Sequence, residues 1–113
     1  MKPPTNELSQ IDCGSGEYRF RVGDRFYYRF TRHGSVGIYA EFEIKGDAVK
    51  FEREIAEYVY PERVKQPGIT GADKERVKWV FEAVAAGRSV VHVMHLFRGR
   101  IEEECNIAII VNG

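Results

Sequence analysis

The chain has 113 residues, and its 17 Lys and Arg side chains balance 17 Asp and Glu side chains, for a formal net charge of zero. This length predicts one domain, residues 1–113, and the balanced charge argues against a dedicated binder of polyanions, which normally has a basic excess. The uncharged run at the C-terminus, which includes residues 107–113, is far shorter than the roughly 20 residues that span a bilayer, and the polar beginning predicts no secretory signal.

Residues 1–16 are polar and contain two prolines and two glycines, which predicts a loose N-terminal arm with a short strand near residues 8–13. Apolar and polar side chains then alternate, as is typical of half-buried strands. Short glycine-containing turns separate these segments, so we expect consecutive strands to pair antiparallel in a meander. The expected strands are 18–22, 26–31, 36–44 and 48–51.

Residues 52–60 fit either a continued strand or one to two helical turns, and the helical template is slightly favoured. After a proline-containing connector, a main helix is predicted at about 71–86, with Thr70 and Asp73 as its capping box. One arc of the helical wheel is apolar, so the helix is expected to pack on the sheet. This arc contains Val77, Val80, Phe81 and Val84.

The last third of the chain predicts a long C-terminal β-hairpin. Residues 89–97 are apolar on both faces, which indicates a central strand, and residues 101–111 alternate after a turn at Gly99. The expected fold class is therefore α+β: a twisted antiparallel sheet of about six strands, with the 71–86 helix on one face and a C-terminal β-hairpin.

The histidines and cysteines do not predict a catalytic or metal site. His92 and His95 are three residues apart, so on a strand they point to opposite faces and cannot bind one ion together. Cys13 and Cys105 can form one bridge, but the sequence favours two reduced thiols in a cytoplasmic protein. We therefore expect no catalytic residue, no metal and no cofactor, and a protein that is not an enzyme.

A turn centred on Gly99 would place Cys105 opposite Val93, with His95 as a diagonal neighbour. A thiolate–imidazole pair would still need a third group to orient it, so Cys105 is interpreted as a small packing residue. A ligand-binding sheet domain, with a pocket near His95 and Cys105, remains an alternative.

Charge is unevenly distributed along the chain. Residues 17–33 carry five arginines and two acids interleaved with aromatic residues, a pattern that suits stacking of single-stranded bases. This alternative, a nucleic-acid-binding module at 18–32, requires one open face that contains Arg19, Arg21, Tyr27 and Arg29. Residues 41–62 instead carry seven acids and three bases.

Exposed carboxylates beside tyrosines suit a basic protein partner, because charge speeds the encounter and aromatic rings anchor the contact. Trp79 lies opposite the apolar arc of the predicted helix. It is either covered by another segment, such as the N-terminal arm, or exposed as an interface anchor. The candidate partner-binding residues are Tyr39, Glu41, Glu43, Tyr58, Trp79, Glu102, Glu103 and Glu104.

Several short motifs between residues 36 and 95 resemble small bacterial immunity proteins of contact-dependent growth inhibition and polymorphic toxin systems. These motifs are Ala40-Glu41-Phe42-Glu43, Lys50–Ile55, Tyr58-Val59-Tyr60-Pro61, the Thr70 cap followed by Asp73-Lys74-Glu75-Arg76-Val77, and the strand after the predicted helix. In that family a tryptophan takes the place of Tyr58. The resemblance implies a cytoplasmic inhibitor that neutralises a cognate toxin, often a nuclease, by direct binding. A homo-oligomer is compatible with the sequence.

Overall fold

The computed structural model of the chain describes residues 8–14, 16–64 and 73–113. Its elements are β1 (Ser9–Ile11), β2 (Glu17–Arg21), β3 (Arg25–His33), a 3-10 turn η1 (Gly34–Val36), β4 (Ile38–Lys45), β5 (Val49–Tyr58), the short helix α1 (Pro61–Val64), β6 (Lys74–Ala83), β7 (Gly87–Phe97) and β8 (Arg100–Asn112). No helix in these ranges is long and apolar enough to cross a bilayer.

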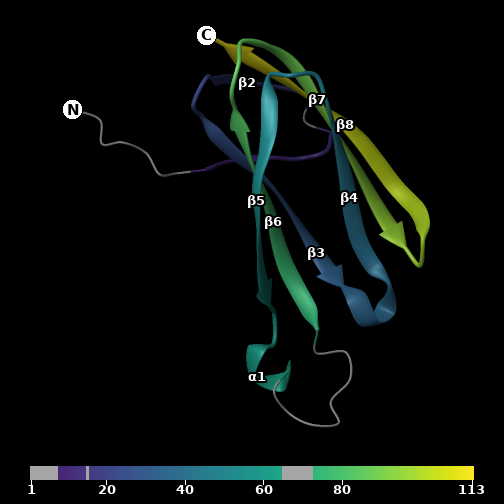
Figure 1. Cartoon of the computed structure of the whole chain (residues 1–113). Coiled ribbons are helices and arrows are strands. Elements are labelled where there is room, and N and C mark those ends of the chain that lie inside the picture. The colour runs from purple at the N-terminus through teal and green to yellow at the C-terminus, as the bar shows by residue number, and fades with distance from the viewer. Residues whose placement is uncertain (1–7, 15, 65–72) are drawn as a thin grey trace.

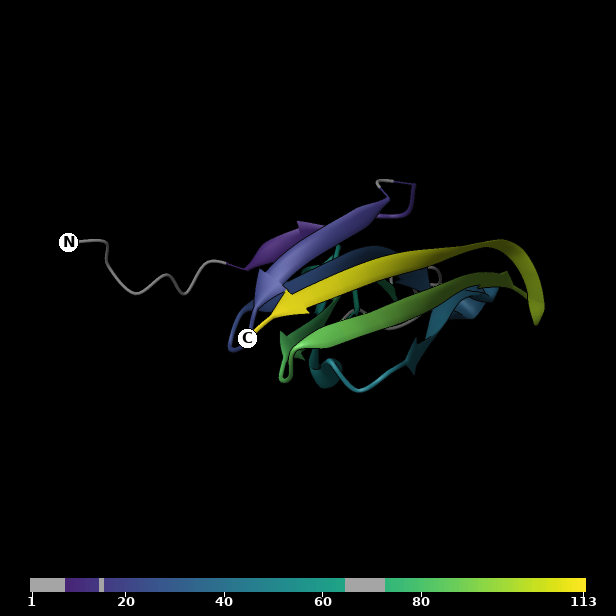
Figure 2. The same ribbon diagram turned by 90° about the horizontal axis from the view of Figure 1, so that it is seen from above.

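The strands form two facing layers that are joined at a corner (Figures 1 and 2). The hydrogen-bonded order is β2-β8-β7-β4-β3-β6-β5, with β1 added along β3. A single residue pair, His33 with Ile38, joins β4 to β3, so the sheet folds over there. One layer is β2-β8-β7-β4 and the other is β1-β3-β6-β5, and the molecule is a β-sandwich.

The core lies between these layers and is rich in aromatic rings. The Phe42 ring of β4 lies 4.7 Å from that of Trp79 on β6, and the Phe20 ring of β2 lies 4.5 Å from that of Phe26 on β3, between ring centroids. Rings in such contact add to the stabilisation from apolar burial. The predicted inward row of β3 is confirmed, because Phe26, Tyr28 and Phe30 are all buried.

The predicted α+β class is wrong, because the segment expected to form the main helix contains strand β6. Every second side chain of β6 from Val77 to Ala83 is buried in the core, namely Val77, Trp79, Phe81 and Ala83, and Val80 is buried as well. β6 pairs with β3 on one side and β5 on the other, which satisfies its backbone groups on both edges. Residues 70–72 of the predicted cap lie outside the described residues.

The expected meander is also wrong. β1 pairs in parallel with β3, and β2 pairs in parallel with β8, so neither early strand pairs with the strand that follows it. Residues 52–58, for which helix was slightly favoured, continue strand β5. The C-terminal hairpin is present, with Cys105 opposite Val93 as expected. Only part of the predicted N-terminal arm lies in the described residues, and there β1 forms.

Candidate functional site

Three chain connections meet at one end of the sandwich, away from the C-terminus (Figure 1). They are the β3–β4 connection, the segment that enters β6 at Asp73, and the β7–β8 turn at Arg98 and Gly99. We call this region the loop end. Connections held by a rigid sheet are where proteins most often place binding residues.

Asp73 joins the first two of these connections. Its carboxylate accepts a hydrogen bond from the Ser35 backbone N–H at 2.7 Å and another from the Ser35 hydroxyl at 2.6 Å. His33 Nε2 lies 3.3 Å from the same carboxylate. The Ser35 hydroxyl, more than any other group, lowers the pKa of Asp73 below its usual range, because these bonds favour the charged form.

Gly37 joins the third connection to the first. Its carbonyl accepts a hydrogen bond from the Arg98 backbone N–H at 2.9 Å, and its own φ is +78°. A Cβ at this position would lie 2.9 Å from Arg98 Cγ, so both the backbone conformation and the close approach require glycine. Arg98 itself has a φ of +51°, an uncommon value for a residue with a side chain.

A salt-bridge network lies beneath the loop end. The Arg32 guanidinium binds the Glu75 and Glu54 carboxylates at 3.1 and 3.2 Å. Both carboxylates raise the pKa of Arg32, and the hydrogen bond to Glu75 has the largest effect. Glu54 also accepts a hydrogen bond from Trp79 Nε1 at 3.1 Å. The network ties β3, β5 and β6 together just below His33, which stiffens the base of the loops.

The loop end also exposes apolar side chains. Ile38 and Ile101 are 40% and 51% exposed, and Tyr58 and Tyr60 are 46% and 43% exposed. Beside Ile38 lies a hollow of about 340 Å³, lined by Ile38, Tyr39, His95, Leu96, Phe97 and Glu102. Exposed apolar groups around a hollow are typical of a surface that binds another protein.

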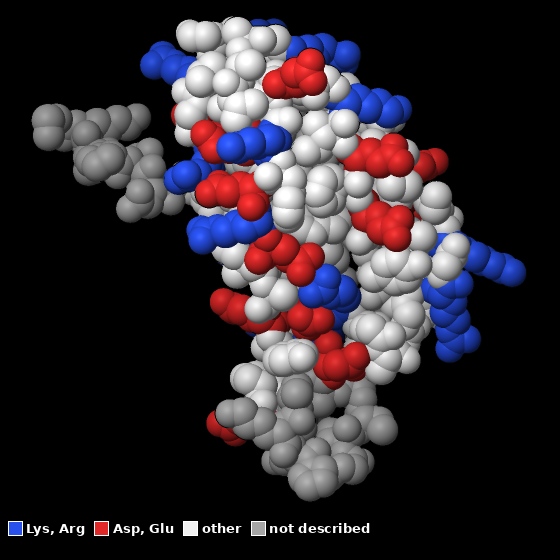
Figure 3. Space-filling view, viewed as in Figure 1, with Lys and Arg blue, Asp and Glu red and all other residues white. Residues whose placement is uncertain are grey.

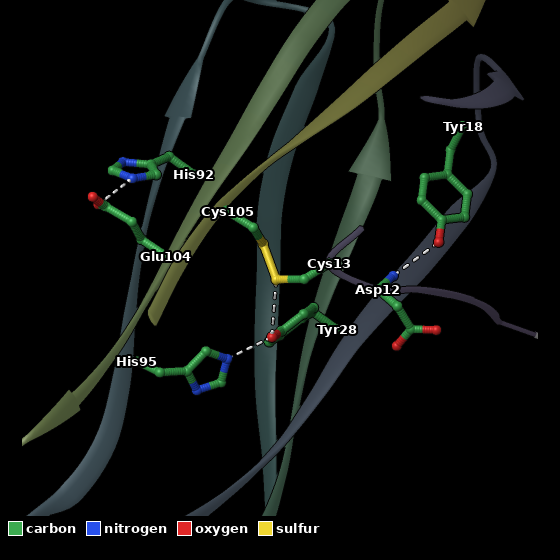
Figure 4. Close-up of a disulfide and its surroundings, with 8 residues drawn as sticks. All are labelled: Asp12, Cys13, Tyr18, Tyr28, His92, His95, Glu104 and Cys105. Carbon is green, nitrogen blue, oxygen red and sulfur yellow. Dashed lines mark hydrogen bonds and ion pairs between the residues drawn. A yellow bond between two sulfur atoms is a disulfide. The ribbon is translucent and has the colours of Figure 1, made fainter. Parts of the chain in front are cut away.

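His95 connects this hollow to a polar cluster inside the sandwich (Figure 4). Tyr28 Oη lies 2.6 Å from His95 Nε2 and 3.6 Å from Cys13 Sγ. Burial, with smaller effects from Glu103 and Asp12, raises the pKa of Tyr28 to about 12. The phenol therefore keeps its proton at neutral pH, and it donates to Nε2 in the His95 tautomer that carries its proton on Nδ1.

Cys13 and Cys105 form a disulfide (Figure 4). The expectation of two reduced thiols is therefore wrong, and Cys105 is not a free packing residue. The bond fastens the segment after β1, in one layer, to β8 in the other. The sequence separation of 92 residues makes the pairing invisible to local sequence patterns.

The predicted partner-binding residues do not form one surface. Tyr39 and Glu102 line the hollow, and Tyr58 is exposed at the end of β5. Glu103 lies opposite His95 in the hairpin, whereas Glu104 pairs with His92 at 2.9 Å. Glu41 and Glu43 are exposed on β4.

Trp79 is 4% exposed and lies among the rings of Tyr28, Phe30 and Phe42. Its candidacy as an interface anchor is therefore corrected: Trp79 is a core residue, packed against rings of β3 and β4. The carboxylates on the face in Figure 3 are also interspersed with Lys and Arg instead of merging into one acidic area.

The open face that the nucleic-acid alternative requires is absent from the described strands, because Arg19 and Arg21 lie on β2 and Tyr27 and Arg29 on β3, in different layers. His92 and His95 belong to different environments, as expected for opposite faces of β7. No group of three or more metal-binding side chains occurs within residues 8–14, 16–64 and 73–113.

Sequence reasoning missed Ser35, Ile38 and Asp73. The sequence pattern places Ser35 only in a turn between the expected strands 26–31 and 36–44, and Asp73 in a helix cap. A glycine followed by an apolar residue, Gly37-Ile38, was the one local signal of an exposed apolar position beside a tight turn.

The fold class is a two-layer β-sandwich with clustered connections at one end, and known structures share it. A cysteine protease inhibitor of Entamoeba histolytica, EhICP2, matches with a TM-score of 0.66 over 86% of each chain, at 7% sequence identity. The solution structure of amebosin matches with a TM-score of 0.63 over 95% of this chain and 100% of that chain, at 12% identity. No protein-family model and no curated protein matches the sequence.

Proposed function

We propose that this protein inhibits a protease, with cysteine proteases as the first class to test, by binding it directly through the loop end. The joining of the three connections carries this proposal: Asp73 holds Ser35, and Gly37 holds Arg98. Connections fixed before binding lose little conformational entropy when a partner is engaged. The exposed Ile38 beside the hollow supplies the apolar contact.

The likeness in fold to EhICP2 supports this choice of partner. The resemblance to immunity proteins suggested a different one, a basic nuclease toxin neutralised in the cytoplasm. A nuclease cleft would favour a continuous acidic surface, whereas the face shown in Figure 3 carries mixed charges. The proposal keeps inhibition by direct binding, which both interpretations share, and assigns no catalytic residue to this chain.

The disulfide supports a place of action outside the reducing cytosol, because such bonds persist mainly in oxidising compartments. This differs from the cytoplasmic location that the sequence suggested. Labelling of free thiols in protein from its native source would test the point. Fully oxidised Cys13 and Cys105 would support the proposed location, and fully reduced thiols would contradict it.

The test of function is the residual hydrolysis of a fluorogenic peptide by a papain-like cysteine protease, titrated with the purified protein. Trypsin serves as a serine protease for comparison. We expect stoichiometric inhibition of the cysteine protease alone. Inhibition of trypsin alone would show that the proposed protease class is wrong, and inhibition of neither enzyme would overturn the proposal.

Two matched variants locate the binding surface. Ile38→Asp places a charge at the loop end, and Val22→Asp places the same charge on an exposed valine (47% exposed) beside the C-terminal end of β8. Ile38→Asp should weaken inhibition at least tenfold, since desolvating a carboxylate in an apolar contact is costly. Val22→Asp should inhibit like the unchanged protein. The reverse result would place the interface at the other end.

A further inference from the structure

The outer face of the β3–β6 pair carries like charges opposite one another. Arg29 and Lys78 are direct cross-strand partners, and Arg76 lies opposite Thr31, the next outward position on β3. Like charges directly opposite in a sheet are destabilising. A sequence that keeps three cations together at this site therefore gives up stability there.

Some cations on these strands are compensated by carboxylates, but these three are not. Arg25 pairs with Glu52 at 2.9 Å, and Lys50 with Glu82 at 3.8 Å. Among the described residues, Arg29, Arg76 and Lys78 make no ion pair. Glu57 lies opposite Arg76 in the register between β5 and β6 and is the nearest candidate acid, yet the two side chains do not reach salt-bridge distance.

The surface is hollowed beside the same cations. One hollow of about 150 Å³ is lined by Arg29, Ile55, Glu57, Arg76 and Lys78. A second hollow, of about 260 Å³, is lined by Arg29, Phe30, Thr31 and Arg76. Both arginines thus border both hollows, so an anionic group seated in either one would meet two guanidinium groups.

The aromatic residue of this face is already engaged. Lys78 Nζ lies 5.1 Å from the centroid of the Tyr27 ring, and the Tyr27 hydroxyl donates to Gln10 at 3.1 Å. Single-stranded nucleic acids need open rings on which bases stack, so this face suits an anionic chain without bases. The disulfide favours a polymer found outside the cytosol.

We propose that Arg29, Arg76 and Lys78 form a binding site for the sulfate groups of a sulfated polysaccharide. The site lies on the outer face of the β3–β6 layer and does not depend on the proposed protease inhibition. The formal net charge of zero is compatible with it, because screening at physiological salt limits each charge to about 8 Å. Binding is therefore local, moderate in strength and sensitive to salt.

The test is calorimetric titration with heparin fragments at several NaCl concentrations, using Arg→Gln variants that each remove one positive charge. Arg29→Gln and Arg76→Gln should each weaken binding on the order of fivefold, the effect of about 1 kcal/mol for one exposed contact. Arg21→Gln, on β2 in the other layer, is the matched control and should change affinity less than twofold. Glu57→Gln should strengthen binding, because it removes the carboxylate from the rim.

Circular dichroism and thermal unfolding of each variant will show that the fold is retained. If unchanged protein fails to bind heparin at 50 mM NaCl, or if Arg21→Gln weakens binding as much as Arg29→Gln, the proposed site is wrong. Tighter binding of a single-stranded oligonucleotide than of heparin would assign the face to nucleic acid instead and overturn the choice of ligand.

Discussion

The carboxylate of Asp73 accepts both the backbone N–H and the hydroxyl of Ser35, at 2.7 and 2.6 Å. These residues are 38 positions apart in the chain, and their contact fixes the β3–β4 connection against the segment that enters β6. Asp73→Ala removes both acceptors. We expect severalfold weaker inhibition with little loss of global stability, since the contact lies at the exposed loop end. Inhibition constants and denaturant unfolding would separate the two effects, and unchanged inhibition would show that the connection need not be held.

The same contact makes the loop end sensitive to acid. Hydrogen bonds from Ser35 lower the pKa of Asp73 below the usual range of an aspartate. A lowered pKa in the folded state means that this stabilisation is complete above about pH 4 and is lost as the pH falls through the folded value. The Asp73 contribution to inhibition should thus be constant from pH 5 to 7 and decline below pH 4. Asp73→Ala should lack this acid-dependent decline.

Tyr28 gives a prediction at the opposite end of the pH scale. Burial raises its pKa to about 12 from 10.0, so the folded state holds the proton more tightly than the unfolded state. Stability from this group is complete below pH 10 and is lost as the pH rises through about 12. Absorbance titration at about 295 nm should show one late-titrating tyrosine that disappears in Tyr28→Phe. Its titration near pH 10 would contradict the buried placement.

Loss of the disulfide should destabilise the sandwich without disrupting the structure of the loop end. The Cys13–Cys105 bond closes a long loop, and removing such a bond costs about 2–4 kcal/mol of unfolding free energy. We expect Cys13→Ala with Cys105→Ala to unfold at lower denaturant concentration yet still inhibit at 25 °C. A double variant as stable as the parent would indicate that the bond contributes little.

Substitutions at Trp79 test whether this residue is part of the core or an anchor for a partner. Trp79→Ala leaves a cavity among Phe30, Phe42 and Tyr28, and such changes cost about 3–5 kcal/mol. Trp79→Phe should cost less, because it keeps most of the ring packing and loses mainly the hydrogen bond to Glu54. Below its melting temperature, Trp79→Phe should inhibit normally. Normal stability with lost inhibition would restore the interface role.

Local alternation in the sequence was sufficient to predict most strands. Phe26, Tyr28 and Phe30 recur with period two, and the structure buries all three. The C-terminal hairpin followed from a turn at Gly99 between two apolar segments, and its register placed Cys105 opposite Val93. These features depend on residues close together in the chain, which is why pattern and turn chemistry suffice for them.

Residues 74–83 show where local pattern fails. Val77 and Phe81 belong both to a helical arc, with Val80 and Val84, and to a strand row, with Trp79 and Ala83. The two templates bury similar amounts of apolar surface, so periodicity alone cannot choose between them. Pairing with β3 and β5 on either side decided for the strand, and both partners are remote in sequence.

The sequence by itself determined the alternating strands, the C-terminal hairpin and the row of core aromatics on β3, because each depends on contacts within a few residues or across one turn. The tertiary structure alone decided that Cys13 meets Cys105, that Asp73 holds Ser35, and that Trp79 is buried. These contacts depend on which strands become neighbours after the sheet folds over. The pairing of these strands minimises the free energy of the whole chain, so it cannot be predicted from any short segment.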